Sequence, residues 1–173
     1  MQHDPHAALD LSSGMSHHAP ENAPRPTRAL PTAGSLRVRV RYCECDPMGV
    51  AHHAAYIPWL EMGRTELLRD AGVSYAELEA SGVFLVIVKL EASYKRPAFY
   101  DDLLEVRTRV IQSTRVKIRH EYEVVRVESG ATIGSGIARQ GMVGEVLVTA
   151  TTLLASVDRT GRPAALPDWL AGE

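Results

Sequence analysis

One helix-length stretch interrupts a chain whose other regular segments alternate between apolar and charged residues. Residues 53–71 place apolar side chains at helical spacing, with Gly72 as the expected stop, and Pro58 fits only in or near the first turn. The segments on either side alternate with a period of two, which is typical of half-buried strands. A single apolar helix cannot stay exposed, so we expect an α+β fold in which an antiparallel sheet curls around it.

Five segments carry the strand pattern. The first begins at Leu36, and the others cover residues 83–94, 104–110, 116–124 and 147–157. The long apolar run 83–94 predicts a central strand that is buried on one face and partly on the other. The connections around residues 100–102 and 112–114 are short, so we expect the strands that they join to pair as antiparallel neighbours.

Two further local signals concern the connections. Ser74, followed by Glu77 three residues later, predicts a capping box that opens a second short helix ending near Ala80. Residues 129–144 form a longer connection than a tight hairpin needs. We expect this segment to shape an assembly interface or a substrate tunnel.

The first 33 residues differ in composition from the rest. They are rich in proline and histidine and carry no periodic apolar pattern, so we predict a disordered leader over 1–33 and a folded domain over 34–173. Met15 is an alternative start of the protein. The scattered histidines of the leader are interpreted as a solvated tail.

Bulk properties exclude several classes of protein. A chain of 173 residues fits one domain, and a formal charge of −2 argues against an electrostatic nucleic-acid binder. No apolar run approaches the length of a membrane span, and the N-terminus has no apolar signal region. Two cysteines, Cys43 and Cys45, are too few for a disulfide framework, which favours a reducing cytoplasm.

The segment from Glu44 to Tyr56 is the strongest candidate for chemistry. It places the carboxylate of Asp46, a turn shaped by Pro47 and Gly49, and two histidines just before the helix. A helix N-terminus offers unpaired N–H groups and a partial positive charge. A carboxylate beside such donors can attack, or direct water at, a carbonyl that the donors polarise.

The residues of this segment resemble a known family. The matching patterns are Tyr42-x-Glu44-Cys45-Asp46-Pro47-x-Gly49-Val50, His53-x-x-Tyr56, Glu61-x-x-Arg64-Thr65-Glu66 and Pro97-Ala98-x-x-Asp101-Asp102-x-Leu104. They are similar to the hotdog-fold 4-hydroxybenzoyl-CoA thioesterases, most of all to the bacterial acyl-CoA thioesterases associated with the Tol–Pal system. The similarity covers residues 36–168. It implies a five-stranded antiparallel sheet around a long helix, hydrolysis of an acyl-CoA thioester, a dimer or tetramer, and neither metal nor cofactor.

The resemblance also implies roles for individual residues. Asp46 corresponds to the nucleophile or general base, although an Asp before Pro is also a common turn residue. The backbone amide of His53 corresponds to the donor that polarises the carbonyl. The substrate-binding candidates are Gly49, Val50, Tyr56 and Arg64. Tyr56 also suits core packing, and Arg64 also suits a pair with Glu61 on the helix.

Three other interpretations stay open. Cys43, Cys45, Asp46 and the two histidines suit zinc by type, but their spacing matches no standard zinc pattern. A hotdog hydratase or dehydratase uses an Asp and a His five residues apart, whereas His52 and His53 follow Asp46 at six and seven. A non-catalytic acyl-binding protein remains a third reading. The acyl group, the exact role of Asp46 and the choice between dimer and tetramer are not readable from the sequence.

Overall fold

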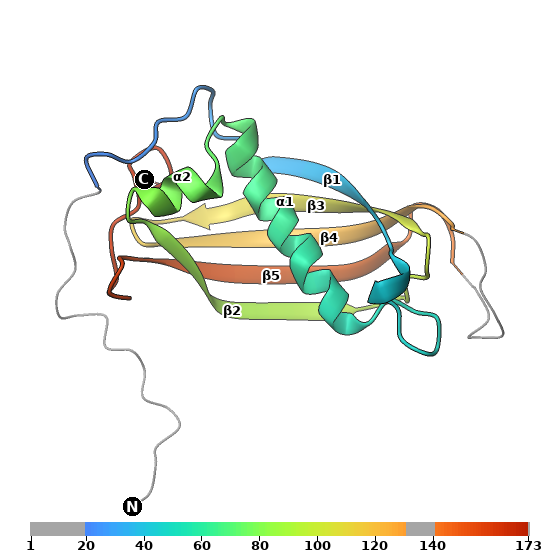
Figure 1. The fold of residues 1–173 in the computed structure, drawn as a ribbon. Helices are drawn as coiled ribbons and strands as arrows, with labels where there is room; N and C mark the ends of the chain where they lie inside the picture. The colour runs from blue at the N-terminus through green and yellow to red at the C-terminus, as the bar shows by residue number, and fades with distance from the viewer. Residues whose placement is uncertain (1–19, 131–140, 173) are drawn as a thin grey trace, which may run out of the picture.

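A computed structural model describes residues 20–130 and 141–172, which form a five-stranded antiparallel sheet with a long helix across one face (Figure 1). The order of strands across the sheet is β1-β3-β4-β5-β2. The strands are β1 (Ala33–Arg39), β2 (Phe84–Tyr94), β3 (Leu103–Ser113), β4 (Lys117–Glu128) and β5 (Val146–Val157). The predicted fold class is therefore confirmed.

The alternation in β3 and β4 divides the sheet into two faces. Leu104 and Val106 are fully buried toward the helix. On the other face, Arg109 lies opposite Glu121 and forms an ion pair at 2.8 Å. Opposite charges on directly paired strands stabilise the pairing modestly. The face of the sheet that points away from the helix therefore carries charged side chains.

The helix α1 (Tyr56–Asp70) follows a short 3₁₀ turn, η2 (His53–Ala55), so the predicted helix over 53–71 is confirmed. Pro58 occupies the first turn of α1, where no helical N–H partner is needed. Gly63 lies directly against the sheet, because a Cβ there would stand 2.4 Å from Thr108 Oγ1. Gly72 ends the helix with a φ of +85°, a conformation that glycine adopts without strain.

The second helix, α2 (Tyr75–Ala80), begins with the predicted capping box. The Ser74 hydroxyl accepts a hydrogen bond from the Glu77 N–H at 3.2 Å, and the Glu77 carboxylate accepts one from the Ser74 N–H at 2.8 Å. None of the helices within residues 20–130 and 141–172 is long and apolar enough to cross a bilayer.

Two predictions about strand order were wrong. The strand β2 lies at the edge of the sheet rather than in its centre, and Val86, Ile87 and Val88 are 41–48% exposed. The connection around residues 100–102 joins β2 to β3, which are separated in the sheet by β4 and β5. An apolar run looks the same in sequence whether a neighbouring strand or another subunit covers it. The connection around 112–114 does join the paired strands β3 and β4, as expected.

The folded part of the chain extends before residue 34. The amides of Thr27 and Arg28 both donate to Ala71 O, the Val110 amide donates to Thr32 O, and Leu30 packs against a second core cluster beside α2. Residues 1–19 lie outside the described residues. So does most of the predicted long connection, since residues 131–140 are not described.

Candidate active site

The turn that holds Asp46 is closed by its own backbone. The Asp46 N–H donates to Val50 O and the Gly49 N–H to Asp46 O, both at 2.9 Å. Gly49 adopts a φ of +81°, which few other residues tolerate. Cys45 and Ala51 then form an antiparallel bridge across the base of the turn. Asp46, Gly49 and Val50 are thus held in one compact loop.

The Asp46 carboxylate is half-buried and makes one local contact. Its Oδ1 accepts a hydrogen bond from the Met48 N–H at 2.9 Å, as an Asp in a turn commonly does. No hydrogen bond within the described part of the chain engages Oδ2. One carboxylate oxygen therefore orients the side chain, and the other is available to a ligand.

The two histidines differ in their roles at the helix start. His52 caps the 3₁₀ turn, because its Nδ1 accepts from the Ala54 N–H at 3.2 Å while its own N–H donates to Glu44 O at 2.8 Å. The His53 ring is exposed and lies 4.0 Å, centroid to centroid, from that of His52. Among the hydrogen bonds of residues 20–130 and 141–172, none uses the His53 N–H. This amide is an unoccupied donor at the entry to the helix.

Glu44 ties the loop to α1, a role that the sequence did not reveal. Its Oε1 accepts from Trp59 Nε1 at 3.1 Å and from Arg41 Nη2 at 2.7 Å. Burial alone raises the pKa of Glu44, but the hydrogen bonds from Arg41 and Trp59 outweigh it, so the pKa lies below its ordinary value of 4.5. Glu44 is therefore ionised at neutral pH and fixes the approach of the turn to the helix.

Tyr56 and Tyr94 pack at the same helix start. Tyr56 is buried, and its ring meets that of Tyr94 edge-on at 5.3 Å. Desolvation raises the pKa of Tyr56 to about 12, so it stays a neutral phenol. The Tyr94 hydroxyl donates to His53 O at 3.2 Å, which pins the 3₁₀ turn to the end of β2.

An open hollow of about 330 Å³ lies beside this helix start. Its lining residues are Ala51, His53, Tyr56, Tyr94, Lys95, Arg96 and Pro97. Two of the lining residues, Lys95 and Arg96, are cations, and Arg96 Nε donates to Glu145 Oε1 at 3.1 Å. The hollow includes His53 and Tyr56 but not Asp46, whose turn precedes Ala51.

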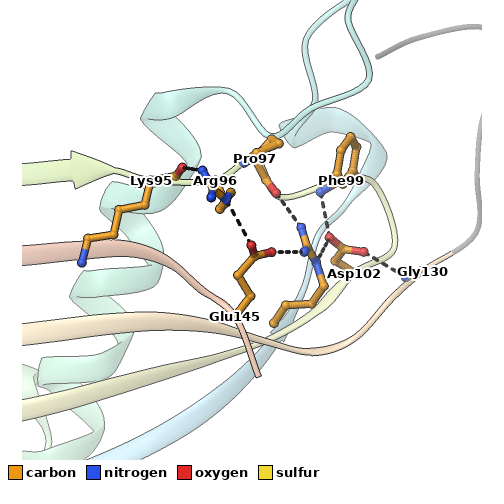
Figure 2. Close-up of polar contacts among 8 residues, drawn as sticks. Lys95, Arg96, Pro97, Phe99, Asp102, Gly130 and Glu145 are labelled. Carbon is orange, nitrogen blue, oxygen red and sulfur yellow. Dashed lines mark hydrogen bonds and ion pairs between the residues drawn. The ribbon is translucent and has the colours of Figure 1, made fainter. Parts of the chain in front are cut away.

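A buried polar network holds the wall of the hollow (Figure 2). Arg126 donates to Asp102 Oδ2 at 2.9 Å, to Glu145 Oε2 at 3.0 Å and to Pro97 O at 2.6 Å. Asp102 in turn accepts from the Phe99 N–H at 2.9 Å. Phe99 forms an antiparallel bridge with Val50, so the network is connected through Phe99 to the turn that holds Asp46.

Arg64 does not join these residues. It lies in the third turn of α1 and is buried, with Nη1 donating to Tyr75 Oη at 2.7 Å and Nη2 to Glu61 Oε2 at 3.2 Å. The expected pair with Glu61 is present. Arg64 instead lines a separate cavity beside the C-terminal half of α1.

Among the described residues, neither the two cysteines nor the potential metal ligands form a site. Cys43 and Cys45 are free, and desolvation together with nearby carboxylates raises the pKa of the Cys45 thiol. A raised pKa leaves little of the reactive thiolate at neutral pH. Within residues 20–130 and 141–172, no three His, Cys, Asp or Glu side chains are grouped so that they could share a metal ion.

Comparison with known proteins identifies a matching family and several relatives. Residues 40–173 match the thioesterase-like superfamily. The chain is 31% identical over 137 residues to the putative acyl-CoA thioesterase YneP of Bacillus subtilis, which covers 76% of this chain and 88% of that protein. It is 35% identical over 92 residues to the acyl-CoA thioester hydrolase YbgC of Escherichia coli, with 53% and 69% covered.

Solved structures agree with the sequence relatives. A probable thioesterase from Bartonella henselae superposes with a TM-score of 0.65 at 31% identity, covering 78% of this chain and 99% of that one. The DHNA-CoA thioesterase of Staphylococcus aureus superposes with a TM-score of 0.66 at 27% identity, covering 78% and 80%.

Proposed function

The chain belongs to the thioesterase-like superfamily, and from that premise we propose that it is an acyl-CoA thioesterase, which hydrolyses a CoA thioester to a free acid and CoA. The relatives that support this activity are named as acyl-CoA thioesterases, and one of them is aligned over 88% of its length. The structural observation that carries the proposal is a carboxylate turn placed directly before a helix start with an unused amide donor.

Two routes to hydrolysis follow from this arrangement, and Asp46 drives the attack in both. As a general base, Asp46 takes a proton from water while the water oxygen adds to the thioester carbon. The carbonyl oxygen becomes an oxyanion, which the His53 N–H stabilises at the positive end of the helix. The carbon–sulfur bond then breaks, and CoA leaves with the proton that Asp46 took up.

The second route uses Asp46 as a nucleophile. Its carboxylate then adds to the thioester carbon and CoA leaves, which creates a mixed anhydride that water hydrolyses to the free acid and the original Asp46. The free Oδ2 beside the oriented Oδ1 suits both routes. The hollow beside His53 and Tyr56, next to the turn of Gly49 and Val50, supplies the approach for the thioester.

The hollow also offers charge for the CoA phosphates. Lys95 and Arg96 are among its lining residues, and the Lys95 side chain extends away from the buried network (Figure 2). Arg96 is already paired with Glu145. We therefore assign the first phosphate contact to Lys95.

We propose that the protein self-associates and acts in the cytoplasm. The edge strand β2 exposes Val86, Ile87 and Val88, an apolar edge that a soluble monomer would normally blunt. A second copy pairing along this edge would cover it. The two free cysteines suit a reducing compartment.

The test is a panel of acyl-CoA thioesters of different chain length and aromatic character, with thiol release measured on the purified protein. Steady turnover of at least one member, unaffected by chelators, is the expected result. Saturable binding without thiol release would make the protein an acyl-CoA binder. Hydration of an enoyl-CoA without thiol release would make it a hydratase.

A further inference from the structure

A second cavity, of about 230 Å³, lies beside the C-terminal half of α1. It is lined by residues of α1, α2 and the sheet, by residues 30–32 before β1 and by residues 169–172. Its walls are largely aliphatic, and they include Leu67, Leu68, Leu85, Val110, Ile118 and Leu154. The lining includes none of the residues of the Asp46 turn.

Three residues of the lining each hold a buried polar atom that has no hydrogen-bond partner within the described part of the chain. These atoms are Arg64 Nε, His120 Nδ1 and Trp169 Nε1. The Arg64 and His120 residues are only 8% and 6% exposed. Proteins pair nearly all such groups, because an unpaired buried donor loses the hydrogen bonds that it made to water. All three belong to residues that line this one cavity, where a bound ligand would supply acceptors for them.

The charges around the cavity define the ligand. Burial, and secondly the charge of Arg64, lowers the pKa of His120 to about 4, so its ring is neutral at pH 7. The guanidinium of Arg64 keeps its positive charge, and its ion-pair partner Glu61 lies on the solvent side with 57% of its side chain exposed. The residues around the cavity therefore carry one cation, Arg64, and two N–H donors without a partner among the described residues, Arg64 Nε and Trp169 Nε1, within largely apolar walls.

We propose that this cavity binds a small apolar monocarboxylate, with the carboxylate accepting hydrogen bonds from Arg64 Nε and Trp169 Nε1. A dry cavity of about 150 Å³ accepts benzene, and drug-sized ligands occupy about 300 Å³ or more. The volume here thus fits a benzoate-sized acid or a short fatty acid and excludes a CoA thioester. The site does not depend on the proposed function, although its ligand is of the class that thioester hydrolysis releases.

The experiment is calorimetric titration of the full chain with hexanoate and benzoate, each compared with its neutral counterpart, hexan-1-ol or benzyl alcohol. We expect one site per chain and acids that bind at least tenfold more tightly than the alcohols. Trp169→Phe keeps an aromatic ring but removes the Nε1 donor, so acid binding should weaken about tenfold. Trp59→Phe removes the other indole N–H of the chain, which donates to Glu44 outside the cavity, and should leave acid binding unaltered.

A second variant tests the charge. Arg64→Gln, checked for a cooperative melt, should bring the acid and alcohol affinities together. Equal affinities in the wild type, or no saturable binding, would overturn the proposal. So would acid binding that is unaffected by Trp169→Phe or that is lost in Asp46→Asn, because the acid would then occupy another site. Binding is measured here without turnover, so failure of this site leaves the thioesterase proposal separately testable.

Discussion

Arg126 and Asp102 form an ion pair, Nε to Oδ2 at 2.9 Å, in which the two side chains are 1% and 0% exposed. The Asp102 carboxylate also accepts the N–H groups of Phe99 and Gly130, each at 2.9 Å. The pair thus fixes the segment that forms the bridge between Phe99 and Val50. A buried charge pair with its remaining hydrogen bonds satisfied positions backbone as well as stabilising it.

Asp102→Asn should destabilise the fold strongly. The substitution leaves the buried Arg126 charge with Glu145 alone, and breaking one partner of a buried pair typically costs about 3–5 kcal/mol. Urea unfolding measures the loss. The matched control is the neighbouring Asp101→Asn, which removes an exposed pair with Arg39 and should cost at most about 1 kcal/mol. Equal losses in the two variants would contradict a special role for the buried pair.

Asp46→Asn should remove turnover while it preserves the fold. The amide oxygen can still accept the Met48 N–H, but the group can neither attack nor take a proton at neutral pH. We expect the rate of thiol release to fall by roughly 10²-fold or more, with CoA-thioester binding retained. Asp70→Asn, an exposed change at the end of α1, is the control and should turn over normally. Thiol release at the wild-type rate in Asp46→Asn would eliminate both proposed routes.

Local signals in the sequence were sufficient for much of the fold. The capping box of Ser74 and Glu77 and the helix stop at Gly72 depend on residues that are close in the chain, and both are confirmed. The period-two pattern of residues 116–124 identified β4 for the same reason. Asp46-Pro47-x-Gly49 likewise predicted a turn before the helix, which is present.

The order of strands and the supports of the site depend on contacts between distant residues. Tyr94 reaches His53 across 41 positions, and Arg126 reaches Asp102 across 24. The pattern of apolar and polar residues does not show which distant residue will form hydrogen bonds with a buried Arg or Tyr. The family resemblance implies that Arg64 binds substrate, whereas its side chain lies two turns beyond the start of α1, in contact with Tyr75 and beside the second cavity.

Gly63→Ala should destabilise the helix–sheet contact. Its Cβ would stand 2.4 Å from Thr108 Oγ1, so overpacking of about 1–3 kcal/mol should exceed the gain in helix propensity of about 1 kcal/mol. Thr108→Ala removes that oxygen, which has no hydrogen-bond partner within residues 20–130 and 141–172. Combining the two changes should therefore restore stability relative to Gly63→Ala. The free energy of unfolding is measured with denaturant. If the double variant loses as much of it as the two single variants together, the close approach is not the cause.

His120 should make the protein sensitive to mild acid. Its folded pKa of about 4 lies below the ordinary 6.5, so the unfolded chain binds the extra proton first as the pH falls. Folding stability should therefore be full above pH 6.5 and should decline between pH 6.5 and 4. His120→Phe should reduce this decline in melting temperature, with the difference between the proteins constant from pH 7 to 8. A parallel decline in both proteins would rule out His120 as its source.

Val88→Lys should prevent self-association. Val88 lies on the edge strand β2, at the irregularity between Ile87 and Lys89, and is 48% exposed in the single chain. A lysine at a strand edge disfavours pairing with another copy, because its charge would have to be desolvated in the new interface. Light scattering at micromolar concentration should give a multimer for the wild type and a monomer for Val88→Lys. Ile111→Lys changes a residue of similar exposure, 42%, on the internal strand β3 and should leave the multimer intact. A wild-type monomer, or a Val88→Lys multimer, would show that this edge is not the interface.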